Sequence, residues 1–208
     1  MTMAQHSVDE FLERLASSAA TPGGGSAAAI MGAMGAALIS MVCNVSLGKK
    51  GYEAVEGEML AIRAESERWR LRLTEMVEDD VAAFDGLMAA YKRPKSTDEE
   101  KARRSAAIQE NLIRATEVPL ECARACAAVI ALARRASERG YKGVISDAGV
   151  GVLSAYAALR SAALNVYINA PSLEDREAAE RYVREIDRLV ADGSREHEAV
   201  FSIVRAKL

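Results

Sequence analysis

The feature that most constrains the fold of this chain is a stretch without a charged side chain, which runs from Gly23 to Gly48. Its length is sufficient to cross a bilayer. It is, however, rich in Ala, Gly, Ser and Asn, and it has few large aliphatic side chains. Gly25, Ala29 and Gly32 recur at helical spacing, and such small residues let neighbouring backbones approach closely. We therefore predict a buried central helix and no membrane span.

The overall charge excludes several classes of partner. The chain has 208 residues with 30 acidic and 27 basic side chains, a formal net charge of −3 and 5% aromatic residues. This balance gives no long-range attraction for nucleic acid or anionic lipid. Three cysteines are an odd and sparse set, which is typical of a reducing compartment. The first residues contain no apolar secretory core, so we expect a cytoplasmic protein with neither a nucleic-acid nor a membrane partner.

Residues that could bind a metal are few and scattered. His6 and His197 lie near opposite ends of the chain, and Cys122 and Cys126 are four residues apart on one predicted helix face. A zinc site needs three or four such ligands, and a nucleophilic triad needs a histidine base. We expect no metal, and we interpret the two cysteines as small buried side chains between packed helices.

Helical periodicity recurs along the whole sequence, while strand patterns are almost absent. The segment from Glu53 to Lys92 contains no proline and predicts one long helix of about 60 Å, unless Gly86 kinks it. A compact chain of this length has a diameter of only about 43 Å. The helix would extend beyond such a globule, and its apolar stripe would then need a partner chain. This favours an elongated subunit in an obligate homodimer.

Several signals divide the rest of the chain. Pro94 ends the long helix, and capping-box patterns at 96–99 and 97–100 begin the next one. Pro119 predicts a bend or a restart, and Gly140 predicts the end of that helix.

The ends of the two small-residue helices are also predicted. Ser26 is the expected N-cap of the first, after three glycines that we predict to be a loop. A glycine-bearing loop at 143–149 leads into the second, which ends before Pro171, and Ser172 with Asp175 is expected to cap a final charged helix. No linker or repeat is evident. The sequence predicts a single all-α domain over residues 1–208, an elongated helical bundle with one long helix.

Three motifs resemble those of a known family. The segment TPGGGSAAAIMGAMGAALISMVCNVSLGKKGYE at 21–53, the motif DVAAF at 80–84, and VISDAG followed by SAALNV at 144–149 and 161–166 occur in the family's order. They resemble the cyclodeaminase/cyclohydrolase family, which includes the C-terminal domain of formimidoyltransferase-cyclodeaminase and free-standing methenyltetrahydrofolate cyclohydrolases. The resemblance covers essentially the whole chain and is closer to the free-standing enzymes.

The resemblance implies an all-helical dimer that acts on a folate without a metal or a dissociable cofactor. The implied reaction is hydrolysis of 5,10-methenyltetrahydrofolate to 10-formyltetrahydrofolate. Some relatives instead release ammonia from 5-formimidoyltetrahydrofolate, so a cyclodeaminase is one alternative. A non-catalytic helical dimer, acting as a scaffold or binding folate without turnover, is an alternative of another class.

Three residues are candidates for catalysis. Opening of the cationic amidinium by water needs one or two acid or base groups within hydrogen-bond reach. Asp147 and Asp80 match family motifs, although Asp147 also suits a helix cap and Asp80 also suits a solvated helix face. Adjacent ammonium groups and partial burial favour a neutral amine at Lys49 or Lys50, and of the two Lys49 is the preferred candidate. The C-terminal helix dipole accounts for one of these lysines without any catalytic role.

The candidates for substrate binding are the residues around these positions. Glycine-rich backbone at a helix start can bind an anionic or oxygen-rich group, or it can simply turn the chain. Asn44 and Asn165 interrupt apolar helices, where an amide can contact either the pterin or another helix. The predicted substrate-binding residues are Gly23, Gly24, Gly25, Ser26, Asn44, Lys50, Ser146 and Asn165.

Overall fold

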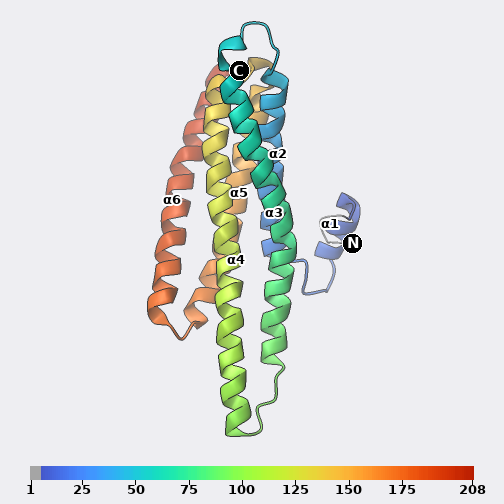
Figure 1. Ribbon diagram of the computed structural model, residues 1–208, viewed down its shortest axis with the longest axis vertical. Coiled ribbons are helices and arrows are strands. Elements are labelled where there is room, and N and C mark those ends of the chain that lie inside the picture. Colours follow the sequence, from blue (N-terminus) through green and yellow to red (C-terminus); the bar gives the residue numbers. More distant parts are fainter. Residues whose placement is uncertain (1–5) are drawn as a thin grey trace.

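The computed structural model describes residues 6–208 and confirms the all-α prediction (Figure 1). Within these residues there are six α-helices, three short 3-10 helices and no strand. The α-helices are α1 (Val8–Leu15), α2 (Gly24–Ser46), α3 (Glu56–Tyr91), α4 (Asp98–Arg139), α5 (Ile145–Asn169) and α6 (Arg176–Lys207). The 3-10 helices are η2 (Glu53–Val55), η3 (Lys142–Val144) and η4 (Ala170–Ser172).

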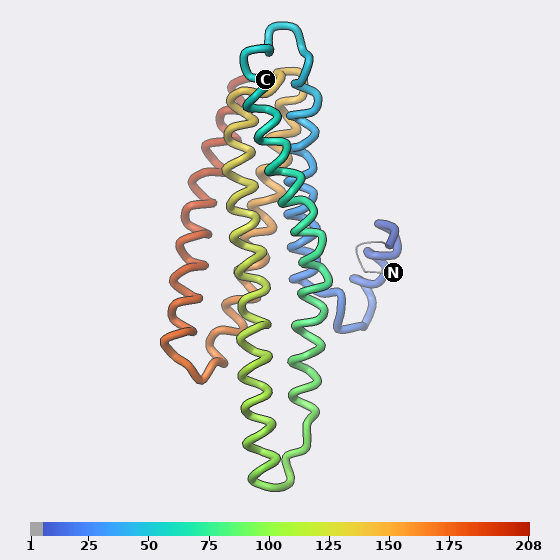
Figure 2. Tube along the Cα trace, viewed as in Figure 1, coloured from blue at the N-terminus to red at the C-terminus, as the bar shows by residue number. Residues whose placement is uncertain are grey.

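Helix α2 is one of the principal helices of an elongated bundle, and most of its apolar stretch is buried. It packs mainly against α3 and α5, while α4 contacts both of these helices and α6 covers α4 and α5 from outside. Figure 2 shows the short α1 beside the bundle, joined to α2 by a loop. The predicted apolar stripe of α1 is only partly used, since Phe11 packs against the core while Val8 and Leu12 are exposed.

The expected long helix is present and has a longer neighbour. Helix α3 has 36 residues and α4 has 42, which correspond to about 54 and 63 Å. The hairpin that joins them extends past the turn between α5 and α6 (Figure 1). Helix α3 is continuous through Gly86. The restart predicted at Pro119 is wrong, because α4 continues through it as one helix.

Three predicted helix starts are also wrong. Helix α5 begins at Ile145, inside the loop predicted at 143–149. Helix α2 begins at Gly24 with Gly23 as its N-cap, so two of the three glycines are helical and Ser26 lies inside the first turn. Helix α6 is capped by Asp175, whose side chain accepts a hydrogen bond from the backbone N–H of Ala178. By contrast, Thr97 and Glu100 form the predicted capping box of α4, which ends at Gly140 as expected.

The small residues of α2 allow very close packing against the antiparallel α5. A Cβ atom added at Gly35 would lie 2.9 Å from the backbone oxygen of Gly151. Further along, the Ser154 hydroxyl donates to the backbone oxygen of Met31 at 2.7 Å. Helix α2 is long and apolar enough to cross a membrane, but most of its apolar stretch is buried within the bundle. This burial confirms the prediction of a central core helix.

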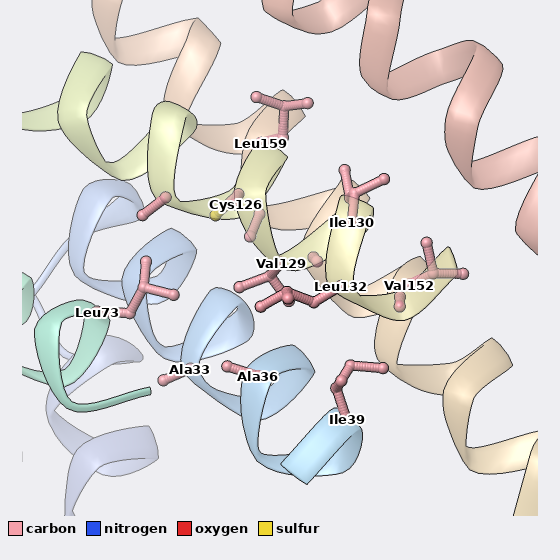
Figure 3. Close-up of a cluster of buried hydrophobic side chains, with 14 of the residues drawn as sticks. Ala33, Ala36, Ile39, Leu73, Cys126, Val129, Ile130, Leu132, Val152 and Leu159 are labelled. Carbon is pink, nitrogen blue, oxygen red and sulfur yellow. The ribbon is translucent and has the colours of Figure 1, made fainter. Parts of the chain in front are cut away.

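Aliphatic side chains from the five helices α2 to α6 complete the core. Figure 3 shows Ala36 and Ile39 of α2 facing Val129 and Leu132 of α4, with Val152 of α5 beside them. All three cysteines are free and buried. Cys126 belongs to this core, so the two cysteines of α4 lie between packed helices as predicted.

Candidate functional site

The first turn of α2 meets the middle of α3 at a partly buried carboxylate. The hydroxyl of Ser26 donates to Oδ2 of Asp80 at 2.7 Å. A Cβ atom at Gly25 would lie only 2.0 Å from Oδ1 of Asp80. The absence of a side chain at Gly25 therefore makes room for the carboxylate, and the hydroxyl of Ser26 orients it. These three residues are among those predicted from the sequence, and the fold brings them together.

The surroundings of Asp80 change its acidity. Burial raises the pKa of this carboxyl above its ordinary value, because removal from water disfavours the charged form. The hydroxyl and backbone amide of Ser26 oppose this effect and stabilise the carboxylate. A carboxyl with a raised pKa is a better proton acceptor and donor near neutral pH than an exposed aspartate.

Asp80 borders a cavity of about 400 Å³ between α3, α4 and the end of α5. This size is within the range of small-molecule sites. Helix α3 contributes Phe84 and Tyr91, and α4 contributes Val118 and Pro119. Residues 80–91 of α3 and 112–119 of α4 therefore form two walls of this cavity. The cavity combines aromatic and aliphatic surface with one partly buried carboxyl.

Two amide side chains at the end of α5 also line the cavity. Asn165, predicted from the sequence, donates from Nδ2 to the backbone oxygen of Ser161 at 3.1 Å. Asn169 donates from Nδ2 to the backbone oxygen of Ala115 in α4 at 2.7 Å. The sequence analysis missed Asn169. The available signal was Pro119, which has no N–H for the carbonyl four residues earlier, but the sequence does not show which side chain replaces that donor.

The other predicted catalytic residues lie around the opposite end of α2. Nζ of Lys49 lies 4.9 Å from the ring centroid of Tyr141, and Tyr141 packs edge-on against Tyr52. Asp147 lies in the first turn of α5, just after η3. It does not cap that helix, whose N-cap is Val144. Lys49 and Lys50 are both exposed, so the expected partial burial of the lysine is absent within one subunit.

Lys49 and Asp80 therefore do not share a site within one chain. Ser26, which touches Asp80, and Ser46, next to the lysine loop, are 20 residues apart on α2. This spacing corresponds to about 30 Å along the helix. Asp147 lies at the lysine end, because α5 is antiparallel to α2.

The remaining predicted binding residues are divided between the two ends. Gly23 and Gly24 begin α2 near Asp80, although Gly24 is exposed and its added Cβ would contact nothing. Asn44 is exposed at the lysine end, where its side-chain oxygen accepts from Arg63 at 3.2 Å. Ser146 is exposed in the first turn of α5. In residues 6–208 no group of three or more His, Cys, Asp or Glu side chains is arranged to hold a metal ion.

The six-helix bundle and its motifs define the class of this protein. Residues 7–188 match the Formiminotransferase-cyclodeaminase family, and the chain belongs to that family. The chain is 56% identical to a methenyltetrahydrofolate cyclohydrolase of Methylorubrum extorquens, with 97% of each chain covered.

More distant relatives contain this unit as part of a larger protein. The chain is 29% identical to the formimidoyltransferase-cyclodeaminase of Rattus norvegicus, of which it spans 37%.

The fold of this chain is similar to the crystal structure of a formiminotetrahydrofolate cyclodeaminase from Thermotoga maritima. The TM-score is 0.82 at 29% identity, over 100% of this chain and 98% of the other.

Proposed function

We propose that this chain is a methenyltetrahydrofolate cyclohydrolase, which hydrolyses 5,10-methenyltetrahydrofolate to 10-formyltetrahydrofolate in the cytoplasm. The observation that carries this proposal is the partly buried Asp80 carboxyl, with its raised pKa, on a cavity of about 400 Å³. It is supported by 56% identity to the cyclohydrolase of Methylorubrum extorquens over nearly the whole chain. The folate is the substrate, and the proposed reaction needs no cofactor.

The chemistry suits a carboxylate close to a cationic carbon. Ionised Asp80 stabilises the amidinium of the substrate and accepts a proton as the water oxygen bonds to the methenyl carbon. The bond from this carbon to N5 then breaks, N5 receives a proton, and loss of the hydroxyl proton leaves the formyl group on N10. One proton is released overall. Phe84 and Tyr91 provide flat apolar surface for the pterin ring.

We further propose that the functional unit is a homodimer that joins the two ends of α2. One face of α2 and α5 carries large apolar side chains that nothing in the described chain covers, namely Met34 (55% exposed), Val150 (55%), Leu153 (42%), Leu164 (68%) and Ile168 (73%). Contiguous exposed apolar surface of this kind is typical of an interface. Met34 lies near the middle of α2, so two copies related by a two-fold axis that passes there perpendicular to the helix would pack their α2 helices antiparallel.

Such a dimer would place the lysine loop of one subunit near the first turn of α2 of its partner. Lys49 and Asp147 of one subunit would then complete the site around Asp80 of the other. In that position Lys49 would bind anionic substrate or transfer a proton, while Lys50 and Ser146 would contact substrate. Asn44 would lie at the edge of the same site, while Gly23, Gly24 and Asn165 would line it on the Asp80 side.

The direct test uses the purified chain and 5,10-methenyltetrahydrofolate, with a chelator present. We expect rapid loss of the amidinium absorbance and formation of 10-formyltetrahydrofolate. Asp80→Asn should lower kcat at least about 100-fold, as expected for removal of a general base. Asp85→Asn is the matched control, since Asp85 is an exposed carboxylate on the same helix. A wild-type rate equal to the uncatalysed rate would overturn the proposal.

A cyclodeaminase is the second candidate, because the similar structure from Thermotoga maritima, with a TM-score of 0.82, is that of a formiminotetrahydrofolate cyclodeaminase. In that reaction N10 attacks the formimidoyl carbon and ammonia leaves, so the ring that hydrolysis opens would be closed in the same cavity. Ammonia release from 5-formimidoyltetrahydrofolate, without hydrolysis of the methenyl compound, would favour this alternative.

A further inference from the structure

Pro119 leaves a backbone carbonyl of α4 without its helical partner. The carbonyl of Ala115 would normally accept from the N–H of residue 119, which proline lacks. An unpaired carbonyl in a partly buried helix is unfavourable. Asn169, at the last residue of α5, supplies the missing donor at 2.7 Å. The proline thus creates an acceptor that fixes an amide side chain from another helix.

This contact also fixes the direction of the Asn169 amide. With the amide turned the other way, its oxygen would face the oxygen of Ala115, and two acceptors would repel each other. The NH₂ group therefore points to α4, and Oδ1 remains as the acceptor available to a ligand. Pro119 and Asn169 both line the cavity that Asp80 borders.

A neutral acceptor has a specific use beside Asp80. The pterin ring presents a donor edge formed by its 2-amino group and the adjacent ring N–H. A second carboxylate could accept from this edge, but it would repel the charge on Asp80 and disfavour its ionisation. An amide oxygen accepts the same hydrogen bonds without adding charge, so Asp80 remains free for proton transfer.

We propose that Asn169 binds the donor edge of the pterin ring through Oδ1, and that Pro119 is the positioning residue which holds it there through the freed carbonyl of Ala115. This inference rests on the proposed function, because it takes a folate as the ligand of the cavity. In this arrangement Asp80 acts at the reacting methenyl carbon and does not bind the donor edge of the ring.

The test compares two ligands that differ by the group recognised. Binding of tetrahydrofolate and of its 2-desamino analogue is measured by calorimetry. We expect the wild-type protein to prefer tetrahydrofolate about tenfold, the cost of leaving a donor or acceptor unpaired. Asn169→Leu should abolish this preference, since leucine has a similar volume and no acceptor. Val118→Ala is the control, because Val118 lines the cavity through apolar contact alone and should weaken both ligands equally.

Pro119→Ala tests the positioning role. Alanine returns a backbone N–H to α4, so the Ala115 carbonyl regains its helical bond and this N–H competes with Asn169 for the same acceptor, which weakens the hold on the amide. We expect the helicity to be unchanged. The preference for tetrahydrofolate over the 2-desamino analogue should fall at least threefold, and its complete loss is the largest effect expected.

The outcomes separate this inference from the proposed function. If the wild-type protein binds neither ligand, the proposed function fails and this inference fails with it. If it binds folate and the folded Asn169→Leu variant keeps the wild-type preference, only the role of Asn169 is overturned. If Asn169→Leu does not fold, an unchanged preference in Pro119→Ala overturns the positioning role and the inference with it.

Discussion

Gly25 and Asp80 lie so close together that a single added methyl group at Gly25 would overlap the carboxylate, 2.0 Å from Oδ1. They are 55 residues apart in sequence and belong to different helices. The hydroxyl of Ser26, at the next residue, bonds the other carboxylate oxygen. The first turn of α2 is therefore shaped to accommodate one charged side chain of α3.

This closeness predicts that Gly25→Ala displaces Asp80 from its position. We expect kcat/KM for the methenyl substrate to fall at least about 100-fold, as for removal of the carboxylate itself. Gly57→Ala is the matched control, because an added Cβ there meets nothing within 4 Å and Gly57 lies outside the proposed site. Steady-state kinetics of the two variants checks the prediction, and equal losses would contradict it.

Asp80→Asn should stabilise the fold at neutral pH while it abolishes turnover. Because burial raises the pKa of Asp80, the folded state binds its proton more tightly than the unfolded state does. The wild-type protein is therefore relatively more stable below the unfolded pKa of Asp80, and it loses this stability as pH rises through the raised folded pKa. Asparagine is neutral throughout and still accepts from Ser26.

The measurement is the Tm of both proteins from pH 7.5 downward. We expect the variant to have the higher Tm at pH 7.5, and the difference to shrink as the pH falls toward the ordinary pKa of an aspartate. Asp85→Asn, exposed on the same helix, should show no such trend. A variant that is less stable than wild type at pH 7.5 would refute this account of Asp80.

A methyl group at Gly35 should destabilise the bundle. Its Cβ would lie 2.9 Å from the backbone oxygen of Gly151 and 3.1 Å from the backbone nitrogen of Ala155. Backbone atoms cannot rotate away, so we expect Gly35→Ala to lower the free energy of unfolding by about 1–3 kcal/mol. Gly57→Ala, in the first turn of α3 with open space around it, should instead add about 0.5–1 kcal/mol. Urea unfolding of the two variants decides the sign at each position.

The proposed dimer predicts complementation between two inactive variants. Lys49→Met and Asp80→Asn should each have little activity alone. If each site combines Lys49 of one subunit with Asp80 of its partner, a mixed dimer has one intact site and one doubly altered site. Equal mixing after reversible dissociation should then restore about one quarter of the wild-type activity.

Substitutions on the exposed apolar face test the dimer interface itself. Met34→Arg, on the exposed apolar face, should reduce the mass in solution to that of a monomer, whereas Phe201→Arg on α6 should not. No recovery of activity on mixing, with exchange of subunits shown independently, would mean that Lys49 and Asp80 do not act in a shared site.

Several elements of the fold could be predicted from local sequence. The long uncharged segment predicted a buried α2, and the absence of proline from 53 to 92 predicted α3, because helical periodicity and chain-breaking residues act within a few turns. The starts of α2, α5 and α6 were misplaced by a few residues. Several residues near each end can cap a helix, and packing selects among them.

The candidate site shows where local information ends. Motif resemblance selected Asp80, Ser26 and Gly25, and the fold brings them into contact. The same resemblance selected Lys49 and Asp147, which lie at the far end of the bundle. A motif identifies residues that are typical of one family, but it does not give the distances between them in the folded chain.

The sequence by itself determined that this chain is helical, that α2 is buried and which family the chain belongs to, because periodicity, small-residue spacing and motifs are properties of neighbouring residues. Only the tertiary structure decided that Asp80 is buried against the first turn of α2 and that Asn169 bonds the carbonyl freed by Pro119. Both contacts join residues more than 50 positions apart, so they depend on how helices pack, and the packing is a property of the whole bundle.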